Sequence, residues 1–274
     1  MPELPEAETL VRGLRPHVIG ETIRRTRVLR PDLLRVGQRS FSSGLAGRRI
    51  TAVERRAKNI VILLDGGERR LVINLGMTGG LYPLGFDPGI ATPTHIGVHF
   101  YFDQGRSLAF RDVRRFGCLE VFDADSWSER ESRFGPEPLS PEYRAEHMHE
   151  ALLKSRTPLR NWLLDQRRIA GVGNIYANEA GYLAGVHPAR PARDVTLGEA
   201  RLLHRHVRDV LRDAIERGGT TLQDYRDVRG EAGDYGRQLQ IYGRDGQPCL
   251  KCGEVVQRMV ISNRSAFFCP TCQS

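Results

Sequence analysis

The sequence predicts an α+β protein, with a β-rich N-terminal half, a helical C-terminal half and a cysteine-bearing hairpin at the end. Short alternating or apolar runs separated by glycine turns fill residues 21 to 122, which is typical of a β-sandwich or barrel. Apolar residues then recur at helical spacing in the second half. The 274 residues are enough for two domains of about 100–150 residues each.

The β-rich half begins with a helix. Apolar residues at 7, 10, 11, 14 and 18 form one buried face, and Gly20 ends the pattern. Strands are expected after it, often followed by turns such as Asp65-Gly66-Gly67. The clearest strands are Asn59–Leu64, Leu71–Leu75, Gly97–Phe102 and Leu108–Phe110.

The helical half follows an acidic, proline-rich stretch, Asp123–Pro141, which we interpret as an interdomain linker. Thr196 and Glu199 form a capping box at the start of the longest helix, and Gly218-Gly219 ends it. The polar, aperiodic stretch Thr220–Arg237 is a long loop of the kind that is often functional. The expected helices are Glu146–Lys154, Pro158–Asp165, Asn174–Ala184 and Thr196–Arg217.

The charge points to a polyanionic partner. The net charge is +8 and the pI about 9.6, and nearly all of the excess is arginine, whose fork matches phosphate oxygens. Nucleic acid is therefore favoured over a membrane surface. No apolar run approaches the roughly 18–20 residues of a membrane-spanning helix. We expect no secretory signal and a reducing cytoplasm, with Cys118 a small buried residue.

Four cysteines predict a metal site. Cys249 and Cys252 form one pair, and Cys269 and Cys272 form another sixteen residues later, which is the spacing of a four-thiolate zinc site. Two disulfides are the weaker alternative. Because four thiolates leave no open position for water, the zinc is expected to be structural. A hairpin between the pairs, with strands at 254–261 and 266–268, would present Arg264 near its tip, either as a solvated charge or as a probe of a DNA groove.

Pro2 and Glu3 are unusual at a chain start. Once the initiator methionine is trimmed, the chain begins with a secondary amine, and an α-amino group has a pKa of about 7.7–8.0. Such an amine attacks an aldehyde-level carbon to form an iminium, with Glu3 as a proton donor or relay. The alternative is a plain helix N-terminus, which also suits prolines and glutamates. These residues alone leave both interpretations open.

Several turn residues suggest contact with a duplex. Met77 lies in a glycine-rich turn, Phe116 is preceded by two arginines, and Lys58 ends a basic run. Each alone is more often a core or solvated residue, but together they suit wedges that fill the gap left by an extruded base. Glycines before Asn174 leave backbone N–H groups that could hold a phosphate, although a tight helix–helix turn is the commoner explanation.

Taken together, these motifs resemble those of bacterial formamidopyrimidine-DNA glycosylases, which remove oxidised purines such as 8-oxoguanine. The resemblance runs nearly end to end. The shared motifs are Met1-Pro2-Glu3-Leu4-Pro5-Glu6, Arg55-Arg56-Ala57-Lys58, Leu75-Gly76-Met77-Thr78-Gly79, Arg114-Arg115-Phe116-Gly117, Gly135-Pro136-Glu137-Pro138-Leu139, Gly171-Val172-Gly173-Asn174-Ile175-Tyr176, Ile241-Tyr242-Gly243-Arg244 and the four-cysteine finger.

The resemblance implies a bifunctional glycosylase and abasic-site lyase. Pro2 would be the Schiff-base nucleophile and Glu3 the general acid, with Lys58 donating a proton in β-elimination and Arg264 serving δ-elimination. Met77, Arg114 and Phe116 would fill the void in the duplex. Further DNA contacts are implied at His95, Arg156, Arg160, Asn174 and Tyr242. One zinc ion on the four cysteines would be the sole cofactor.

The family fold implies four segments. They are an N-terminal β-sandwich with flanking helices at 1–130, a linker at 131–145, a helix–two-turn–helix domain with a lesion-capping loop at 146–239, and a zinc-finger β-hairpin at 240–274. The chain departs from the family pattern in Pro93-Thr94-His95, which keeps only part of a histidine-bearing segment, in the loop Asp227–Gly236, and at two single positions. Asn74 stands where histidine is usual and Arg160 where lysine is usual, and arginine and lysine are not interchangeable in phosphate contacts.

Two other functions remain in view. An endonuclease VIII-like enzyme for oxidised pyrimidines shares Pro2 and Glu3, but that branch usually has glycine at the fourth position, where this chain has Leu4, and lacks the full triad. A non-catalytic zinc-ribbon DNA-binding protein would explain the charge and the cysteines only. The expected partner is damaged double-stranded DNA, bound by a monomer in the bacterial cytoplasm, at the nucleoid.

Overall fold

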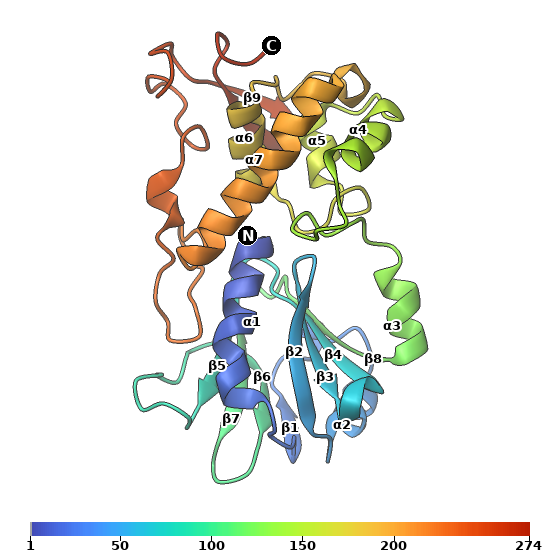
Figure 1. Cartoon of the computed structure of the whole chain (residues 1–274). Coiled ribbons are helices and arrows are strands. Elements are labelled where there is room, and N and C mark those ends of the chain that lie inside the picture. The colour runs from blue at the N-terminus through green and yellow to red at the C-terminus, as the bar shows by residue number, and fades with distance from the viewer. Residues whose placement is uncertain (1) are drawn as a thin grey trace. The chain divides into compact units, whose positions relative to one another are not determined.

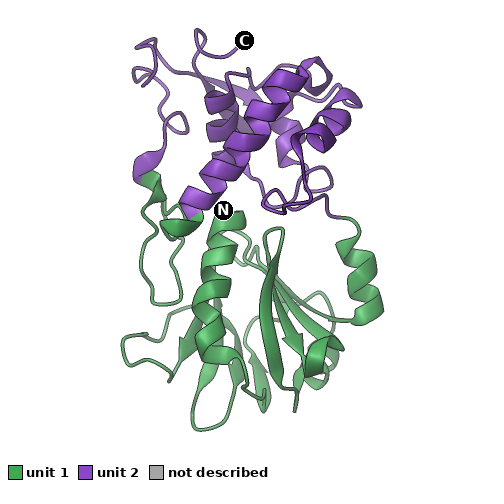
Figure 2. Ribbon diagram, in the orientation of Figure 1, with its two compact units in different colours: residues 1–133, 215–236 green, residues 134–214, 237–274 purple. Residues whose placement is uncertain are grey.

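The computed structural model describes residues 2–274 (Figure 1). The chain divides into two compact units. One contains the chain up to Arg133 together with Ile215–Gly236, and the other contains Phe134–Ala214 and Arg237–Ser274 (Figure 2). The long loop after the last helix therefore belongs largely to the N-terminal unit. Nowhere in residues 2–274 is there a helix with the length and apolar character needed to cross a membrane.

The N-terminal unit is built on two four-stranded antiparallel sheets. Neighbouring strands in each sheet run antiparallel, and the inward faces of both sheets share one hydrophobic core, to which Ile62 and Ile73 contribute from one sheet and Val98 and Phe110 from the other. This arrangement confirms the predicted sandwich. In sheet order, the strands are β1 (Arg25–Val28), β6 (Ile96–Tyr101), β7 (Ser107–Asp112) and β5 (Gly79–Leu84), then β2 (Ile50–Arg56), β3 (Asn59–Leu64), β4 (Arg69–Asn74) and β8 (Cys118–Asp123).

Helix α1 (Leu4–Val18) covers this core, burying the predicted apolar stripe against it. Two other helices were not predicted. Helix α2 (Gln38–Leu45) lies within the region expected to be all strand, and it buries only Phe41 and Leu45, too few residues to reveal a period. Helix α3 (Ala124–Glu131) lies inside the stretch interpreted as linker.

The linker interpretation of residues 123–131 is therefore wrong. Asp123 caps α3, since its Oδ1 accepts a hydrogen bond from the Ser126 N–H at 2.9 Å. Trp127 then anchors the helix, with only 6% of its surface exposed. An acidic cap and one buried tryptophan make a short helix stable here, although its composition is polar.

The C-terminal unit confirms the four predicted helices: α4 (Ala145–Leu153), α5 (Leu159–Leu164), α6 (Asn174–Ala184) and α7 (Leu197–Glu216). At the start of α7 the Thr196 N–H donates to Glu199 Oε2 at 2.8 Å, and the Glu199 N–H donates to Thr196 Oγ1 at 3.3 Å, which is the expected capping box. The hairpin consists of β9 (Gln257–Ile261) and β10 (Arg264–Phe268). Short 3-10 helices occur at η1 (Pro31–Leu33), η2 (Asp65–Gly67), η3 (Ala192–Asp194) and η4 (Tyr235–Gln238).

Candidate active site and zinc finger

The N-terminal residues Pro2 and Glu3 are buried in the structure. Glu3 is the N-cap of α1, and its N–H donates to Glu6 Oε2 at 2.6 Å. Chain ends are usually poorly ordered unless something holds them. Here the first turn of α1 and the carboxylate of Glu6 hold the backbone that carries the predicted nucleophile and acid.

Glu6 also binds the first residue of the long loop, Thr220. Its side-chain Oε1 accepts a hydrogen bond from the Thr220 N–H at 2.7 Å, and its main-chain carbonyl oxygen accepts one from the Tyr225 hydroxyl at 3.4 Å. Gly219, at φ +86°, leaves room for this contact, since a Cβ there would lie 3.0 Å from Glu6 Oε1. Burial raises the pKa of Tyr225, so its hydroxyl stays protonated and can donate.

Glu6 is thus a site residue that the sequence reasoning missed. Its side chain is 1% exposed, and its two oxygens join residues 3 and 220. The spacing of Glu3 and Glu6 at a helix start was the available signal, because a residue at N3 often accepts from the N-cap N–H. No comparable sequence pattern indicates that the Thr220 N–H is the second group bound by Glu6.

Lys58 lies in the turn between β2 and β3 and is half-buried. The preceding residue, Ala57, has φ 55°. Arg55 fixes this turn to α1: its Nε donates to Glu8 Oε2 at 3.1 Å and its Nη1 donates to the Ala57 carbonyl at 3.0 Å. Burial alone would raise the pKa of Glu8, but hydrogen bonds and charge from Arg12 and Arg55 outweigh it and hold that pKa below its ordinary value.

The three predicted wedge residues come from two loops that the structure brings together. Met77 is half-buried in the connection from β4 to β5, whereas Arg114 and Phe116 are exposed in the connection from β7 to β8. The Arg114 guanidinium lies 4.8 Å from the centre of the Phe116 ring, which is 57% exposed. The Arg114 N–H donates to Thr78 Oγ1 at 2.9 Å and so links the two loops.

His95 and Asn74 lie close to these loops in the fold. His95 precedes β6 with φ 60°; its side chain is exposed, and its carbonyl accepts the Asp112 N–H at 3.3 Å. The Asn74 amide makes two bonds within the protein, donating to Asn59 Oδ1 at 3.0 Å and accepting from the Gly76 N–H at 3.0 Å. Asn74 therefore supports the turn that carries Met77.

In the C-terminal unit, α5 and α6 hold the finger hairpin. Arg160 is 2% exposed, and its guanidinium donates to the carbonyls of Ile261 at 3.2 Å and Ser265 at 2.8 Å. Asn174 Nδ2 donates to the same Ser265 carbonyl at 3.0 Å. Burial, and then the charge of Arg264, lower the pKa of Arg160. Both terminal nitrogens of Arg160, a predicted phosphate ligand, therefore donate to the protein.

The hairpin presents Arg264 in an exposed position. Arg264 is the first residue of β10 and pairs with Ile261, and Ser262 and Asn263 form the turn with φ of 45° and 63°. The Ile261 and Ser265 carbonyls, which accept hydrogen bonds from Arg160, flank the three residues 262–264 at the tip of the hairpin. Arg160 consequently defines where the tip lies relative to α5.

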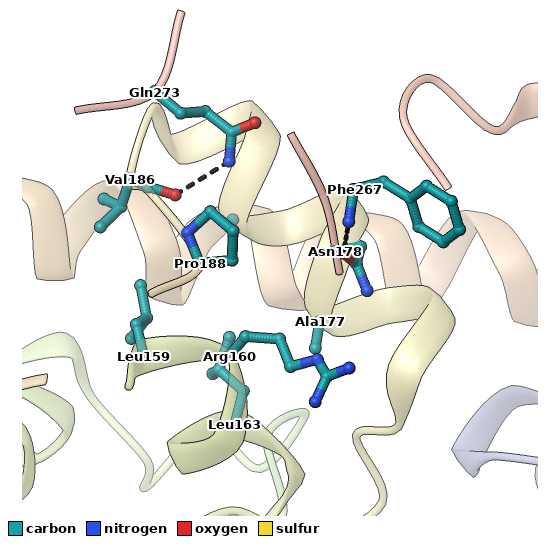
Figure 3. A pocket seen from close by; sticks show the side chains of 10 residues that line it. Leu159, Arg160, Leu163, Ala177, Asn178, Val186, Pro188, Phe267 and Gln273 are labelled. Carbon is teal, nitrogen blue, oxygen red and sulfur yellow. Dashed lines mark hydrogen bonds between the residues drawn. The ribbon is translucent and has the colours of Figure 1, made fainter. Parts of the chain in front are cut away.

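A small cavity lies beneath the hairpin and shows how the finger packs on α5 and α6 (Figure 3). Asn178 Oδ1 accepts the Phe267 N–H at 2.7 Å, and Gln273 Nε2 donates to the Val186 carbonyl at 2.9 Å, as the dashed lines in Figure 3 mark. Both side chains are buried. They satisfy backbone groups that would otherwise be costly to bury.

The remaining predicted DNA contacts differ in accessibility. Arg156 is exposed after α4, whereas Tyr242 is half-buried with its ring 5.1 Å from that of Phe267. The Tyr242 N–H donates to Glu179 Oε1 at 2.8 Å, and Glu179 accepts two further backbone N–H groups. Burial raises the pKa of Glu179 even though these bonds favour its charged form.

The four cysteines form one cluster that fits a zinc ion. Their sulfur atoms lie within 4.8 Å of one another, with Cys249 and Cys272 at 3.9 Å and Cys252 and Cys269 at 3.5 Å. Tetrahedral zinc with bonds of about 2.3 Å places its sulfur ligands about 3.8 Å apart, whereas a disulfide requires about 2.05 Å. The cluster therefore matches one structural zinc. The Tyr182 hydroxyl from α6 lies 3.1 Å from Cys249 Sγ.

Family models match most of the chain. The N-terminal domain of formamidopyrimidine-DNA glycosylase matches residues 1–119, the H2TH domain of the same family matches residues 134–226, and the zinc finger found in FPG and IleRS matches residues 246–274. Together they cover the sandwich, the helical region and the cysteine cluster.

Whole-chain relatives agree. The formamidopyrimidine-DNA glycosylases of Chloroflexus aggregans and Paracoccus denitrificans are each 42% identical, over all of this chain and 98% and 100% of the relatives. The crystal structure of the MutM (Fpg) protein of Thermus thermophilus matches with a TM-score of 0.88 at 42% identity, covering 99% of this chain and 98% of that one. Lactococcus lactis Fpg in complex with DNA containing an abasic site matches with a TM-score of 0.90 at 30% identity, covering 99% of each chain. The chain belongs to the formamidopyrimidine-DNA glycosylase family.

Proposed function

We propose that this protein is a bifunctional DNA glycosylase and abasic-site lyase that removes oxidised purines from duplex DNA. The observation that carries the proposal is the buried position of Pro2 and Glu3, with the Glu6 carboxylate holding the first turn of α1. A secondary amine with a pKa of about 7.7–8.0 is in part unprotonated near neutral pH and can act as a nucleophile.

The reaction begins when the Pro2 nitrogen attacks the anomeric carbon of the damaged nucleotide. The bond from that carbon to the base breaks, the base leaves with a proton, and Glu3 protonates the sugar ring oxygen so that the ring opens to an iminium. The iminium withdraws electrons and acidifies the adjacent sugar protons. Loss of these protons expels first the 3′ phosphate and then the 5′ phosphate, and water finally releases the sugar remnant from Pro2.

Lys58 and Arg264 serve the elimination steps in this proposal. Lys58 donates a proton in the first elimination, and Arg264 holds a phosphate that becomes a leaving group. Arginine suits that task because its fork binds phosphate oxygens with two parallel hydrogen bonds. The hydrogen bonds from Arg160 and Asn174 to the Ser265 carbonyl support Arg264 at an exposed position.

The duplex is opened by the wedge residues Met77, Arg114 and Phe116. An exposed aromatic ring stacked beside a guanidinium suits insertion into the space of an extruded base.

Related Lactococcus lactis Fpg proteins have been solved with DNA that contains Fapy-dG or an abasic site, which supports this substrate class. The zinc holds the finger and takes no part in the chemistry.

Binding is expected to depend strongly on phosphate contacts. The net charge of +8 and the exposed Arg156 and Arg264 favour a polyanion, so affinity should fall steeply as salt rises. We infer that the protein acts as a monomer at the bacterial nucleoid. Sedimentation of the protein with and without a short lesion duplex tests the one-to-one stoichiometry.

Borohydride trapping tests the function. A covalent adduct is expected on duplexes with 8-oxoguanine opposite cytosine, and Pro2→Gly, which replaces the secondary amine, should lower its yield sharply. A stronger adduct on an oxidised pyrimidine would place the enzyme with the endonuclease VIII-like branch. No adduct on either substrate, or one unchanged in Pro2→Gly, would contradict the mechanism and favour a non-catalytic DNA-binding protein.

A further inference from the structure

Two buried polar side chains lie under the wedge loops and take no part in the chemistry described above. Thr78 is 4% exposed and Asp112 is 2% exposed. The Thr78 hydroxyl donates to Asp112 Oδ1 and accepts the Arg114 N–H at 2.9 Å. Asp112 Oδ2 accepts the Gly117 N–H at 2.7 Å. Because a carboxylate only accepts, the direction of each bond in this network is determined.

The network spans both ends of one wedge loop and reaches the other. Arg114 and Gly117 are the first and last residues of the segment that carries Phe116, and both give their N–H groups to it. Thr78 directly follows Met77 in the other loop. The three wedge residues are thus joined through two buried side chains.

Backbone packing joins the same two loops a second time. Gly76 has φ 59°, and a Cβ there would overlap the backbone of Phe116 and Gly117. The sheet topology explains this proximity. Both loops cross between the sheets at the same end, since Gly79 pairs with Asp112 in one sheet and Asn74 pairs with Cys118 in the other.

We propose that Thr78 and Asp112 are positioning residues that join the Met77 turn and the Arg114–Gly117 segment into one preformed wedge. The inference rests on the proposed role of Met77, Arg114 and Phe116 in opening the duplex. A wedge that is already ordered loses little conformational entropy when it enters the base stack. Two separately mobile loops would have to be ordered at the moment of insertion, and the rate of base extrusion would fall.

Thr78→Val is the sharpest perturbation, because it keeps the β-branched shape and removes the hydroxyl. It leaves the Arg114 N–H and Asp112 Oδ1 without this partner. Thr78→Ser restores the hydroxyl and is the matched control. A lost buried hydrogen-bond partner typically changes a rate or equilibrium about tenfold.

The test compares two substrates in single-turnover borohydride trapping. On a duplex with 8-oxoguanine opposite cytosine, Thr78→Val should be about tenfold slower than the native protein, and Thr78→Ser should recover most of the rate. On single-stranded DNA with a preformed abasic site, which requires no wedge, all three proteins should react alike. Asp112→Asn should show the same selective loss, because an amide supplies one acceptor where the carboxylate supplies two.

Two results would overturn the inference. One is an unchanged duplex rate in Thr78→Val. The other is an equal loss on both substrates, which would indicate general destabilisation. Phe116→Ala separates this inference from the proposed function: if it slows duplex excision while Thr78→Val does not, the wedge stands and the linkage fails. If Phe116→Ala has no effect, the wedge role itself fails.

Discussion

Replacing Glu6 by glutamine removes one of the two carboxylate oxygens that hold the first turn of α1 and the start of the long loop. In the native protein Oε2 accepts the Glu3 N–H at 2.6 Å and Oε1 accepts the Thr220 N–H at 2.7 Å, in a side chain that is 1% exposed. Glutamine has a single carbonyl oxygen, and its amide group would face the second N–H as donor against donor. The variant therefore loses at least one bond to a charged acceptor.

The expected cost follows from that geometry. A hydrogen bond to a charged group contributes about 1.5–3 kcal/mol, so Glu6→Gln should lower the free energy of unfolding by about 2 kcal/mol. The rate of borohydride trapping should fall as well, because the backbone of Pro2 and Glu3 loses its restraint. Urea unfolding monitored by fluorescence gives the first quantity, and quenched-flow trapping gives the second.

A matched control separates this effect from simple loss of charge. Glu129 pairs with Arg133 on the surface, with 72% of its side chain exposed, so Glu129→Gln should change stability by less than about 0.5 kcal/mol. If Glu6→Gln is as stable as Glu129→Gln and traps DNA at the native rate, Glu6 does not hold the site in the way described above.

Three further predictions concern pH, the finger and the metal. Hydrogen bonds and charge from Arg12 and Arg55 lower the Glu8 pKa in the folded state despite its burial, so these pairs stabilise the protein above the ordinary carboxyl pKa and cease to do so as pH falls through the lowered value. Glu8→Gln should cost about 1 kcal/mol at pH 7, and urea unfolding should show this cost shrinking as pH falls below the ordinary carboxyl pKa. Arg160→Lys should loosen the finger tip, because the guanidinium uses two separate nitrogens for the Ile261 and Ser265 carbonyls and lysine has only one. Amide exchange at residues 262–265 should accelerate, and unchanged exchange would contradict the bracing role. Metal analysis should find one zinc per chain. Removing the zinc with a chelator should lower the affinity for duplex DNA sharply, and adding zinc back should restore that affinity. As a control, Cys118→Ser should bind zinc normally.

Periodicity made the regular elements predictable. The apolar stripe of α1 and the capping box of α7 appear where the residue pattern places them, and β3 begins and ends at the predicted residues 59 and 64. The cysteine spacing likewise predicted the zinc cluster. These features depend on residues that are close in sequence, so a local pattern carries the information.

Short helices and buried polar residues could not be predicted in the same way. Helix α3 depends on one cap and one buried tryptophan, which leaves no repeating pattern. Glu6 contacts Thr220, and Thr78 contacts Asp112 and Arg114, across separations that only the folded topology creates. A buried carboxylate and an exposed one look identical in a sequence until the partners that desolvate them are known.

Arg160 has a structural role that its place in the family pattern does not predict. Its place in the motif suggests a phosphate ligand, but its guanidinium is buried and donates to two hairpin carbonyls. Arginine has five donors in a rigid fork, so two of its nitrogens donate to the two carbonyls at once, whereas a lysine would have a single nitrogen for both. At this position Arg160 therefore fixes the hairpin to α5.

The central claim is that the Pro2 nitrogen bonds to the sugar of the damaged nucleotide. Mass spectrometry of the proteolysed borohydride adduct tests this most directly, because it locates the DNA remnant on one residue. The expected result is a remnant on the N-terminal proline of a chain that lacks Met1. A remnant on Lys58 or another lysine, with the N-terminal peptide unmodified, would contradict it.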